Sequence, residues 1–246
     1  MKAIGVIPAR WASTRFAGKV LASIAGKPMI QRVWEQACKA KKLNDLLIAC
    51  DEERVRKVVE RFGGKAIMTA KNHPSGTDRI AQAVSKIKCD VVVNIQGDEP
   101  LIDPKLIDSV IAALQKDRVC VMATAAKLFH DGETLNNPNI VKVVLDKNNR
   151  ALYFSRHGIP FNRDKKPLQK IRYYKHFGIY GYRRDFLLKF KDMPRGILEQ
   201  IEKLEQLRAL ENGYAIKVVV TKTDSVGVDI PEDVRKVEAV LKKRKI

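Results

Sequence analysis

Short apolar runs rich in β-branched residues alternate with segments of helical period along the first half of the chain, and this alternation constrains the fold most. The apolar runs predict strands at residues 3–7, 46–50, 66–69, 91–95 and 119–124. Strands separated by helices are typical of βαβ units, in which consecutive strands pair in parallel. The chain is therefore expected to be an α/β protein with a mostly parallel central sheet.

Helix starts are marked by proline and by small polar residues. Pro28 and Pro104 stand where the first turn of a helix tolerates proline. Asp51 is expected to cap the helix after the second strand, and Thr77 or Asp78 the helix after the third. Helices are therefore expected between the strands.

The pattern changes after residue 125. Two apolar runs, 141–145 and 151–154, flank an Asp-Lys-Asn-Asn turn and predict a β-hairpin. The basic stretch 158–174 has no period and is expected to be a loop. The remaining expected elements are a strand at 176–182, a helix at 198–211, a strand at 216–220 and a helix after Pro231. Because there is no repeat and no flexible linker, a single domain with an inserted hairpin and arm is expected over 1–246.

Length and composition place the chain among globular proteins. Of its 246 residues, 45% are hydrophobic and 30% are charged, which argues against disorder. No apolar run approaches the roughly 18 residues of a membrane span, and the first apolar run is interpreted as a strand rather than a signal peptide. We therefore expect a cytoplasmic protein without a membrane partner. Cys38, Cys50, Cys89 and Cys120 lack metal-ligand spacing and are expected to be buried free thiols.

The formal net charge of +19 allows two interpretations. One is a polyanionic partner such as nucleic acid. The other is a lysine-rich surface around an enzyme with an anionic substrate. The charge is spread along the whole chain, and neither an aromatic-basic RNA motif nor a zinc finger is present. Nucleic acid is therefore not expected as a partner, although nucleic-acid binding stays the remote alternative.

A carboxylate follows the apolar run at 91–95. The next residues are Gln96-Gly97-Asp98-Glu99-Pro100, so Asp98 falls just past the carboxyl end of the expected strand. Open α/β sheets bind ligands at that edge. A carboxylate there can hold Mg²⁺ against the phosphates of a nucleotide.

The loop after the first expected strand, 8–19, carries three cations. It is not a P-loop, because the first glycine is missing and Val20 follows Lys19, and it does not match G-x-G-x-x-G. Arg10, Arg15 and Lys19, with Ser13 between them, can neutralise a triphosphate. The alternative is a solvated basic loop.

A second loop with ligand-binding character lies at 73–79. Its Ser75-Gly76-Thr77 run precedes a helix start, where a base edge or an anion can bind. The alternative is an ordinary capped helix that binds no ligand.

These segments belong to a longer series of family-like motifs that occur in order over nearly the whole chain: residues 7–10, 13–15, 18–19, 26–30, 75–77, 94–100, 137–139, 141–146, 151–156, 176–182, 204–208 and 227–233. Together they resemble the sugar nucleotidyltransferases, and within them the 3-deoxy-manno-octulosonate (KDO) cytidylyltransferases. The chain departs from the family pattern at Trp11, at Phe16-Ala17-Gly18 and in a shorter arm before Tyr173.

The resemblance implies a fold and a reaction. The fold is the Rossmann-like nucleotide-diphospho-sugar transferase fold, with nucleotide binding mainly in 1–125, sugar binding and dimerisation in 126–215, and a return to the core in 216–246. The reaction joins CTP and KDO into CMP-KDO with release of pyrophosphate, uses Mg²⁺, and supplies lipopolysaccharide synthesis. The implied partners are CTP, KDO and a second copy of the chain.

The resemblance also assigns roles. Asp98 and Asp229 form the metal pair, and with Lys19 and Arg15 they are the catalytic residues. The nucleotide-binding residues it implies are Ala9, Arg10, Ser13, Ser75, Gly76, Thr77, Arg79 and Gln96. The sugar-binding residues are Gln96, Arg156, His176, Tyr180, Glu202, Glu205 and Gln206. Without the resemblance, Asp229 would be interpreted as a helix cap ahead of Pro231.

Spacing adds detail for the sugar-binding set. His176, Gly178 and Tyr180 share one face of a regular strand, so His176 and Tyr180 can bind one polyol together. Glu202 and Gln206 are neighbours at i,i+4 if the segment is one helix. A structural histidine and a solvated acidic stripe are the alternatives.

The expected chemistry is direct in-line attack of the KDO anomeric hydroxyl on the α-phosphorus, with no covalent intermediate. The general base stays open. The nearest rival function is cytidylyl transfer to another sugar acid, an acylneuraminate or amino-KDO. A catalytically silent nucleotide-binding module is a further alternative.

Overall fold

A computed structural model describes residues 1–12, 16, 18–129, 135–167, 170–224 and 226–243. The chain divides into two compact units, Met1–Asp108 with Ser225–Ile246 and Ser109–Asp224. Each unit contains its own set of paired strands. The functional ranges expected from the sequence, with limits at 125 and 215, stay a prediction.

Four parallel strands form the centre of the first unit. They are β1 (Ala3–Ala9), β4 (Asp45–Cys50), β5 (Ala66–Met68) and β6 (Val91–Asn94), in the order β6-β1-β4-β5. β1 and β6 are almost entirely buried, as their continuous apolar sequences predict. The α/β class with a mostly parallel sheet is thereby confirmed.

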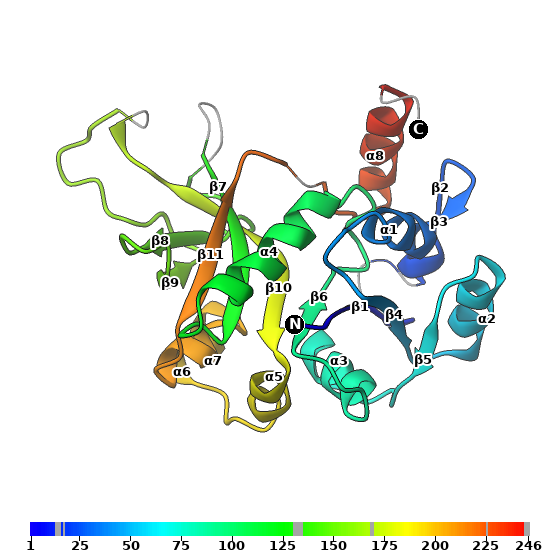
Figure 1. The fold of residues 1–246 in the computed structure, drawn as a ribbon. Coiled ribbons are helices and arrows are strands. Elements are labelled where there is room, and N and C mark those ends of the chain that lie inside the picture. The colour runs from blue at the N-terminus through cyan, green and yellow to red at the C-terminus, as the bar shows by residue number, and fades with distance from the viewer. Residues whose placement is uncertain (13–15, 17, 130–134, 168–169, 225, 244–246) are drawn as a thin grey trace. The chain divides into compact units, whose positions relative to one another are not determined.

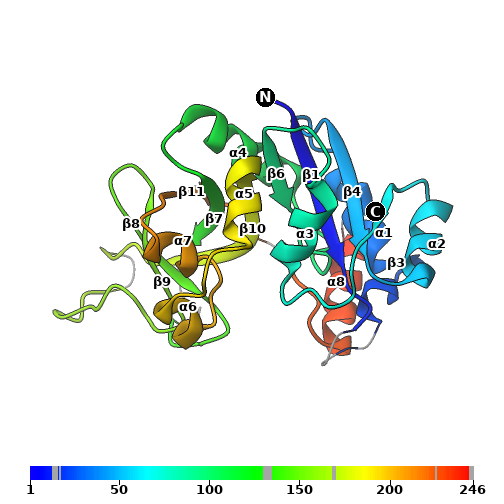
Figure 2. The same ribbon diagram turned by 90° about the horizontal axis from the view of Figure 1, so that it is seen from below.

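Helices cover this sheet on both faces. They are α1 (Met29–Ala37), α2 (Glu53–Arg61), α3 (Gly76–Val84) and the C-terminal α8 (Pro231–Lys243). Figure 1 shows α1 above and α3 below the strands, and in Figure 2 α3 stands in front of β1 and β4. A short 3-10 turn, η1 (Lys19–Leu21), and the two-residue strands β2 (Ser23–Ile24) and β3 (Lys27–Pro28) precede α1. α4 (Pro104–Lys116) begins at the expected proline and leads into the second unit.

The second unit is mixed. Its strands are β7 (Met122–Leu128), β8 (Lys142–Leu145), β9 (Ala151–Ser155), β10 (Tyr174–Arg183) and β11 (Ile216–Thr221). β10 is antiparallel to β7 and β8, β11 is parallel to β7, and β8 and β9 form the predicted hairpin. The helices are α5 (Arg184–Phe190), α6 (Ile197–Glu202) and α7 (Leu207–Glu211). β7 begins and ends a few residues later than expected, and α5 was not predicted.

The expected helix at 198–211 is wrong, since α6 and α7 are separate helices. Lys203 between them has a left-handed backbone with φ 54°. Arg208 donates to both carboxylate oxygens of Glu199 at 2.7 and 2.6 Å, and both side chains are buried. In one continuous helix these residues would lie about 13 Å apart along the axis. The buried ion pair therefore requires the chain to fold back.

Two expected helix caps are also wrong. Ser75, rather than Thr77 or Asp78, is the N-cap of α3, and its hydroxyl accepts from the Asp78 amide at 3.1 Å. Asp51 does not cap α2, whose N-cap is Glu52. The Asp51 carboxylate is instead used in a buried ion pair.

That ion pair joins Asp51 to Arg79. Arg79 is fully buried, and its guanidinium donates to Asp51 Oδ2 at 2.9 Å and to Thr69 Oγ1 at 2.5 Å. Asp51 Oδ1 also accepts from the Trp11 amide at 3.0 Å. One pair thus links α3 to residues that lie one or two positions after the ends of β1, β4 and β5.

All four cysteines are free thiols. Cys50 and Cys120 are buried, as expected, and burial raises the pKa of each thiol to about 11. The expectation is wrong for Cys38, which is exposed, and for Cys89, which is partly exposed. No helix formed by the described residues has the length and apolar character that a bilayer crossing requires.

We predict that Asp51→Asn destabilises the protein strongly, because it leaves the Arg79 charge buried without its counter-ion. Removing one partner of a buried pair typically costs about 3–5 kcal/mol. Urea unfolding measures the loss. Glu53→Gln, which breaks an exposed pair with Arg56 on α2, is the matched control and should change stability little. Equal losses in the two variants would contradict a structural role for the Asp51–Arg79 pair.

Candidate active site

The first unit gathers its predicted ligand-binding loops at the carboxyl end of β1. Gly97, after β6, lies so close to Pro8 that a Cβ atom there would be 2.8 Å from the Pro8 carbonyl oxygen. Gly76, which opens α3, lies 3.6 Å from the Pro8 ring by the same measure. Because only glycine permits the approach at position 97, the backbone itself sets the place of Asp98.

One cation joins the two predicted metal carboxylates. Lys19 Nζ donates to Asp98 Oδ2 at 2.7 Å and to Asp229 Oδ1 at 3.5 Å. It also donates to the Val228 carbonyl at 3.1 Å, and the Val228 amide donates to the Asp98 carbonyl at 2.8 Å. Residues that lie more than 200 positions apart in the sequence therefore meet at a single point.

Asp229 is not the cap of α8. Its own amide and that of Ile230 donate to the Asp233 carboxylate, at 3.0 and 3.3 Å. Asp233 thus satisfies the start of the helix, and the Asp229 carboxylate is directed to Lys19 instead. The two carboxylates remain partly exposed, at 31% and 56% for Asp98 and Asp229, whereas the Lys19 side chain is 15% exposed.

The donor set suits a hard divalent cation. Within the described parts of the chain, no group of three or more His, Cys, Asp and Glu side chains is arranged to hold a metal ion. Mg²⁺, however, is commonly bound by one or two carboxylates together with substrate phosphates and water. Asp98 and Asp229 already converge on one positive charge, so these residues fit Mg²⁺.

The other predicted nucleotide residues lie around the same end of β1. Ala9 is the last, buried residue of the strand, and Gln96 follows β6. Arg10 comes next to Ala9, and its Nη2 atom is buried with no hydrogen-bond partner among the described residues. A buried guanidinium nitrogen without a partner is costly unless a ligand accepts from it. Ser13 and Arg15 lie outside the described residues.

Arg79 departs from its predicted nucleotide-binding role. Its side chain is fully buried against Asp51 and Thr69. Arg79 therefore holds the residues that follow β4 and β5 in place and does not face a ligand. Burial lowers the pKa of Arg79, Asp51 opposes that shift, and the nearby charge of Arg10 adds to it. Ser75, Gly76 and Thr77 form the N-terminus of α3, where backbone N–H groups favour an anion.

The second unit brings together three of the predicted sugar-binding residues. Tyr180 donates its hydroxyl to Gln206 Oε1 at 3.1 Å, and the rings of Tyr180 and His176 lie 5.5 Å apart. Gln206 Nε2 is buried and has no hydrogen-bond partner among the described residues. An unpaired buried amide donor beside a tyrosine suits a hydroxyl-rich ligand.

His176 and Tyr180 meet through a bulge and not through regular alternation. In a regular strand, positions four residues apart are separated by about 13 Å. The pairing of β10 with β7 shifts between Phe177 and Tyr180, and the Thr124 hydroxyl donates to the Ile179 carbonyl inside this bulge at 2.7 Å. The prediction that the two side chains lie together is right, but the reason given for it was wrong.

Thr124 also decides the state of His176. Its one hydroxyl proton is used toward backbone carbonyls, so its oxygen accepts from His176 Nε2, 2.8 Å away. Burial lowers the pKa of His176 to about 3, which keeps the ring neutral. Burial also raises the pKa of Tyr180 well above its usual value, with nearby Glu205 adding to the effect. Both groups therefore offer hydrogen bonds without a change of charge.

Glu202 and Arg156 are engaged with each other. The Glu202 carboxylate accepts from Ser155 Oγ at 2.7 Å and from the Arg156 amide at 2.9 Å. The Arg156 guanidinium donates to the carbonyls of Glu202, Pro138 and Lys203. Each of the three guanidinium nitrogens therefore has a backbone partner, and the sugar-binding role of Arg156 stays a prediction. Glu205 lies 3.7 Å from Arg208 Nη2 and is partly exposed.

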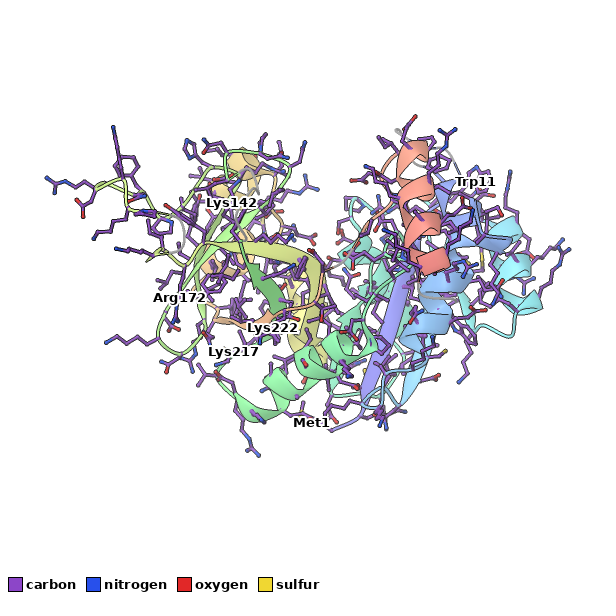
Figure 3. The ribbon with its side chains drawn as sticks, turned by 90° about the horizontal axis from the view of Figure 1, so that it is seen from above. Met1, Trp11, Lys142, Arg172, Lys217 and Lys222 are labelled. Carbon is purple, nitrogen blue, oxygen red and sulfur yellow. The ribbon has the colours of Figure 1, made fainter. Side chains whose placement is uncertain are left out.

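Sequence reasoning missed Thr124, Ser155 and Lys142. Lys142, labelled in Figure 3, is fully buried and donates to the carbonyls of Asn137, Ile140 and Arg156 at 2.9, 2.7 and 2.5 Å. Burial lowers its pKa. The available signal was a polar residue inside an otherwise apolar strand, as with Thr124 in the run 122–126.

Comparison with known proteins agrees with this arrangement. The model of the cytidylyltransferase family matches residues 4–222. A 3-deoxy-manno-octulosonate cytidylyltransferase of Geotalea uraniireducens strain Rf4 is 49% identical over 99% of this chain and 100% of its own. That of Solibacter usitatus strain Ellin6076 is 50% identical over 98% of this chain and 95% of its own.

A solved structure is similar over the full length. The structure of CMP:2-keto-3-deoxy-manno-octonic acid synthetase complexed with CTP is 41% identical, with a TM-score of 0.94 over 99% of this chain and 100% of that one. The predicted nucleotidyltransferase fold is thereby confirmed. The chain belongs to the cytidylyltransferase family and, within it, to the 3-deoxy-manno-octulosonate cytidylyltransferases.

Proposed function

We propose that the protein transfers CMP from CTP to the anomeric hydroxyl of KDO, releasing pyrophosphate and forming CMP-KDO for lipopolysaccharide biosynthesis. The observation that carries the proposal is the meeting of Lys19, Asp98 and Asp229 beside the carboxyl end of β1. At that edge of the sheet, two carboxylates can bind the metal ion of a metal-bound triphosphate, and the cation can neutralise its phosphate oxygens. The choice of KDO as the sugar acid is supported by the similarity to the 3-deoxy-manno-octulosonate cytidylyltransferases.

At the nucleotide end, the chain supplies charge and position. Lys19 donates to both carboxylates and is close enough to neutralise a phosphate oxygen bound beside them. Arg10 Nη2, which has no partner among the described residues, and the first turn of α3 offer further donors to an anion. Asp98 and Asp229 would hold Mg²⁺, which when bound offsets the repulsion between nucleophile and phosphate and lowers the pKa of a bound hydroxyl.

At the sugar end, the chain supplies neutral hydrogen bonds. Tyr180 fixes the Gln206 amide with its oxygen toward the phenol, so Nε2 is directed to a ligand. Since His176 stays neutral, we assign it to binding and not to proton transfer. Neutral donors and acceptors bind polyol hydroxyls without the desolvation penalty of a charge.

We further propose a cytoplasmic homodimer. Free thiols are typical of a reducing compartment, and all four cysteines are free. α6 exposes Ile197, Leu198 and Ile201, which lie at i, i+1 and i+4 on one short helix. An apolar helix face of this kind supports contact with a second copy.

The first test is pyrophosphate release from CTP and Mg²⁺ with a panel of sugar acids. We expect turnover with KDO, weak or no turnover with an acylneuraminate, and little turnover when UTP, ATP or GTP replaces CTP. Asp98→Asn should lower kcat by about 10²–10³-fold, since several kcal/mol of charge stabilisation is lost. Asp185→Asn, at a 98% exposed carboxylate, is the matched control. Absence of turnover with KDO, or an unimpaired Asp98→Asn protein, would refute the proposal.

A second prediction concerns Gln206→Leu. The change removes a buried donor that has no partner among the described residues, but it also removes the acceptor of the Tyr180 hydroxyl, so stability should fall by about 1–3 kcal/mol. The KM for KDO should rise by about 10-fold, because a hydrogen bond to a substrate hydroxyl is lost. The KM for CTP should stay constant. Loss of stability together with unchanged KM values would assign Gln206 to the core instead.

A third prediction uses the pH dependence of stability. The pKa of His176 is about 3 in the folded protein, below its unfolded value near 6.5, so protons bind preferentially to the unfolded chain between these limits. Stability is fully present above about pH 6.5 and falls as the pH is lowered toward 3, by up to about 1.4 kcal/mol per unit. His176→Gln should flatten this dependence in urea unfolding at pH 4.5 to 7. His157→Gln, at an exposed histidine, should retain the wild-type slope.

A further inference from the structure

Trp11 follows Arg10 directly. It lies near the start of the segment 8–19, whose three cations are predicted to neutralise the triphosphate. Its amide donates to Asp51 Oδ1 at 3.0 Å, and its carbonyl accepts from the Gly18 amide at 3.2 Å. In Figure 3, β1 runs from the end marked by Met1 to the end marked by Trp11. The main chain of Trp11 is therefore fixed between the end of β4 and the residue that precedes Lys19.

The indole ring covers Gly18. A Cβ atom at position 18 would lie 2.8, 3.1 and 3.2 Å from three atoms of the ring, closer than packed side chains approach. Gly18 also has φ 66°, in the left-handed region that favours glycine. Both the contact and the backbone require glycine here, so the position of the ring limits where Gly18 can lie.

A cation from α2 holds the ring. The guanidinium carbon of Arg54 lies 4.3 Å from the centroid of the Trp11 ring, within the range of a cation–π interaction. Arg54, Trp11 and Gly18 thus form a stack that connects the first turn of α2 to η1. Lys19 is the next residue after Gly18 and the first of η1.

We propose that Trp11 is a positioning residue for nucleotide binding, which acts by holding Gly18 and, through it, the Lys19 ammonium beside Asp98. The inference rests on the proposed function, because the ligand that Lys19 meets is taken to be the triphosphate of CTP. A displacement of Gly18 moves Lys19 directly, since the two residues are adjacent. A misplacement of about 1 Å in such a site can lower activity by up to about 10²-fold.

The test uses Trp34→Phe protein, in which Trp11 is the one remaining tryptophan of the chain. Trp11 emission should change saturably as CTP is added with Mg²⁺. Arg54→Gln in this background should shift the emission and weaken CTP binding by about 3-fold, as expected for a partly exposed cation–π pair. Arg54 is 59% exposed, so this variant keeps the fold.

Calorimetry extends the test to variants without the indole. Trp11→Ala should weaken CTP binding and raise the KM for CTP, each by about 10-fold, with the KM for KDO unchanged. Trp11→Tyr retains an aromatic ring and should restore CTP affinity to within about 3-fold of wild type. A merely structural role would lower stability without separating the two KM values.

Two results overturn the inference. One is unchanged CTP affinity in both Trp11→Ala and Arg54→Gln. The other is an equal rise in both KM values in Trp11→Ala. If the unmodified protein turns over CTP and KDO while either result is found, only the positioning role fails. If the unmodified protein neither binds nor turns over CTP, the proposed function fails and the inference fails with it.

Discussion

The buried ion pair between Arg79 and Asp51 is the interaction on which the arrangement of the predicted nucleotide-binding segments of the first unit depends. It brings α3 against the end of β4, and its Thr69 contact adds the end of β5. The second oxygen of Asp51 binds the Trp11 amide and so fixes the start of the loop after β1. A charged pair suits this place because its geometry is directional, whereas apolar packing alone tolerates small shifts of a loop.

The two units present different chemistry. In the first unit, the candidate site is built from full charges: Lys19 lies between the carboxylates of Asp98 and Asp229. In the second, the buried groups are neutral, because burial holds His176 uncharged and Tyr180 protonated. A charged group binds phosphate and metal strongly, while a neutral one discriminates hydroxyls without the penalty of burying a charge. This difference between charged and neutral groups agrees with a reaction that transfers a nucleotide from a nucleoside triphosphate to a sugar acid.

Some predictions from local spacing were wrong because contacts between distant residues determine the structure at those positions. The i,i+4 relation of Glu202 and Gln206 assumed one helix, but the Glu199–Arg208 pair folds the chain back at Lys203. Arg79 stands in a loop with ligand-binding character and is nonetheless fully buried. In each case the residue type was informative and its partner was not visible from spacing.

The sequence by itself determined the parallel strands of the first unit, the hairpin, the helix starts at Pro104 and Pro231, and the place of Asp98 just past the carboxyl end of a strand. Periodicity and proline placement are local properties, so they can be read along the chain. Only the tertiary structure decided that Lys19 bridges Asp98 and Asp229, that a bulge brings His176 to Tyr180, and that Trp11 covers Gly18. These contacts depend on how distant segments pack, and packing is set by the whole chain rather than by the pattern of any one segment.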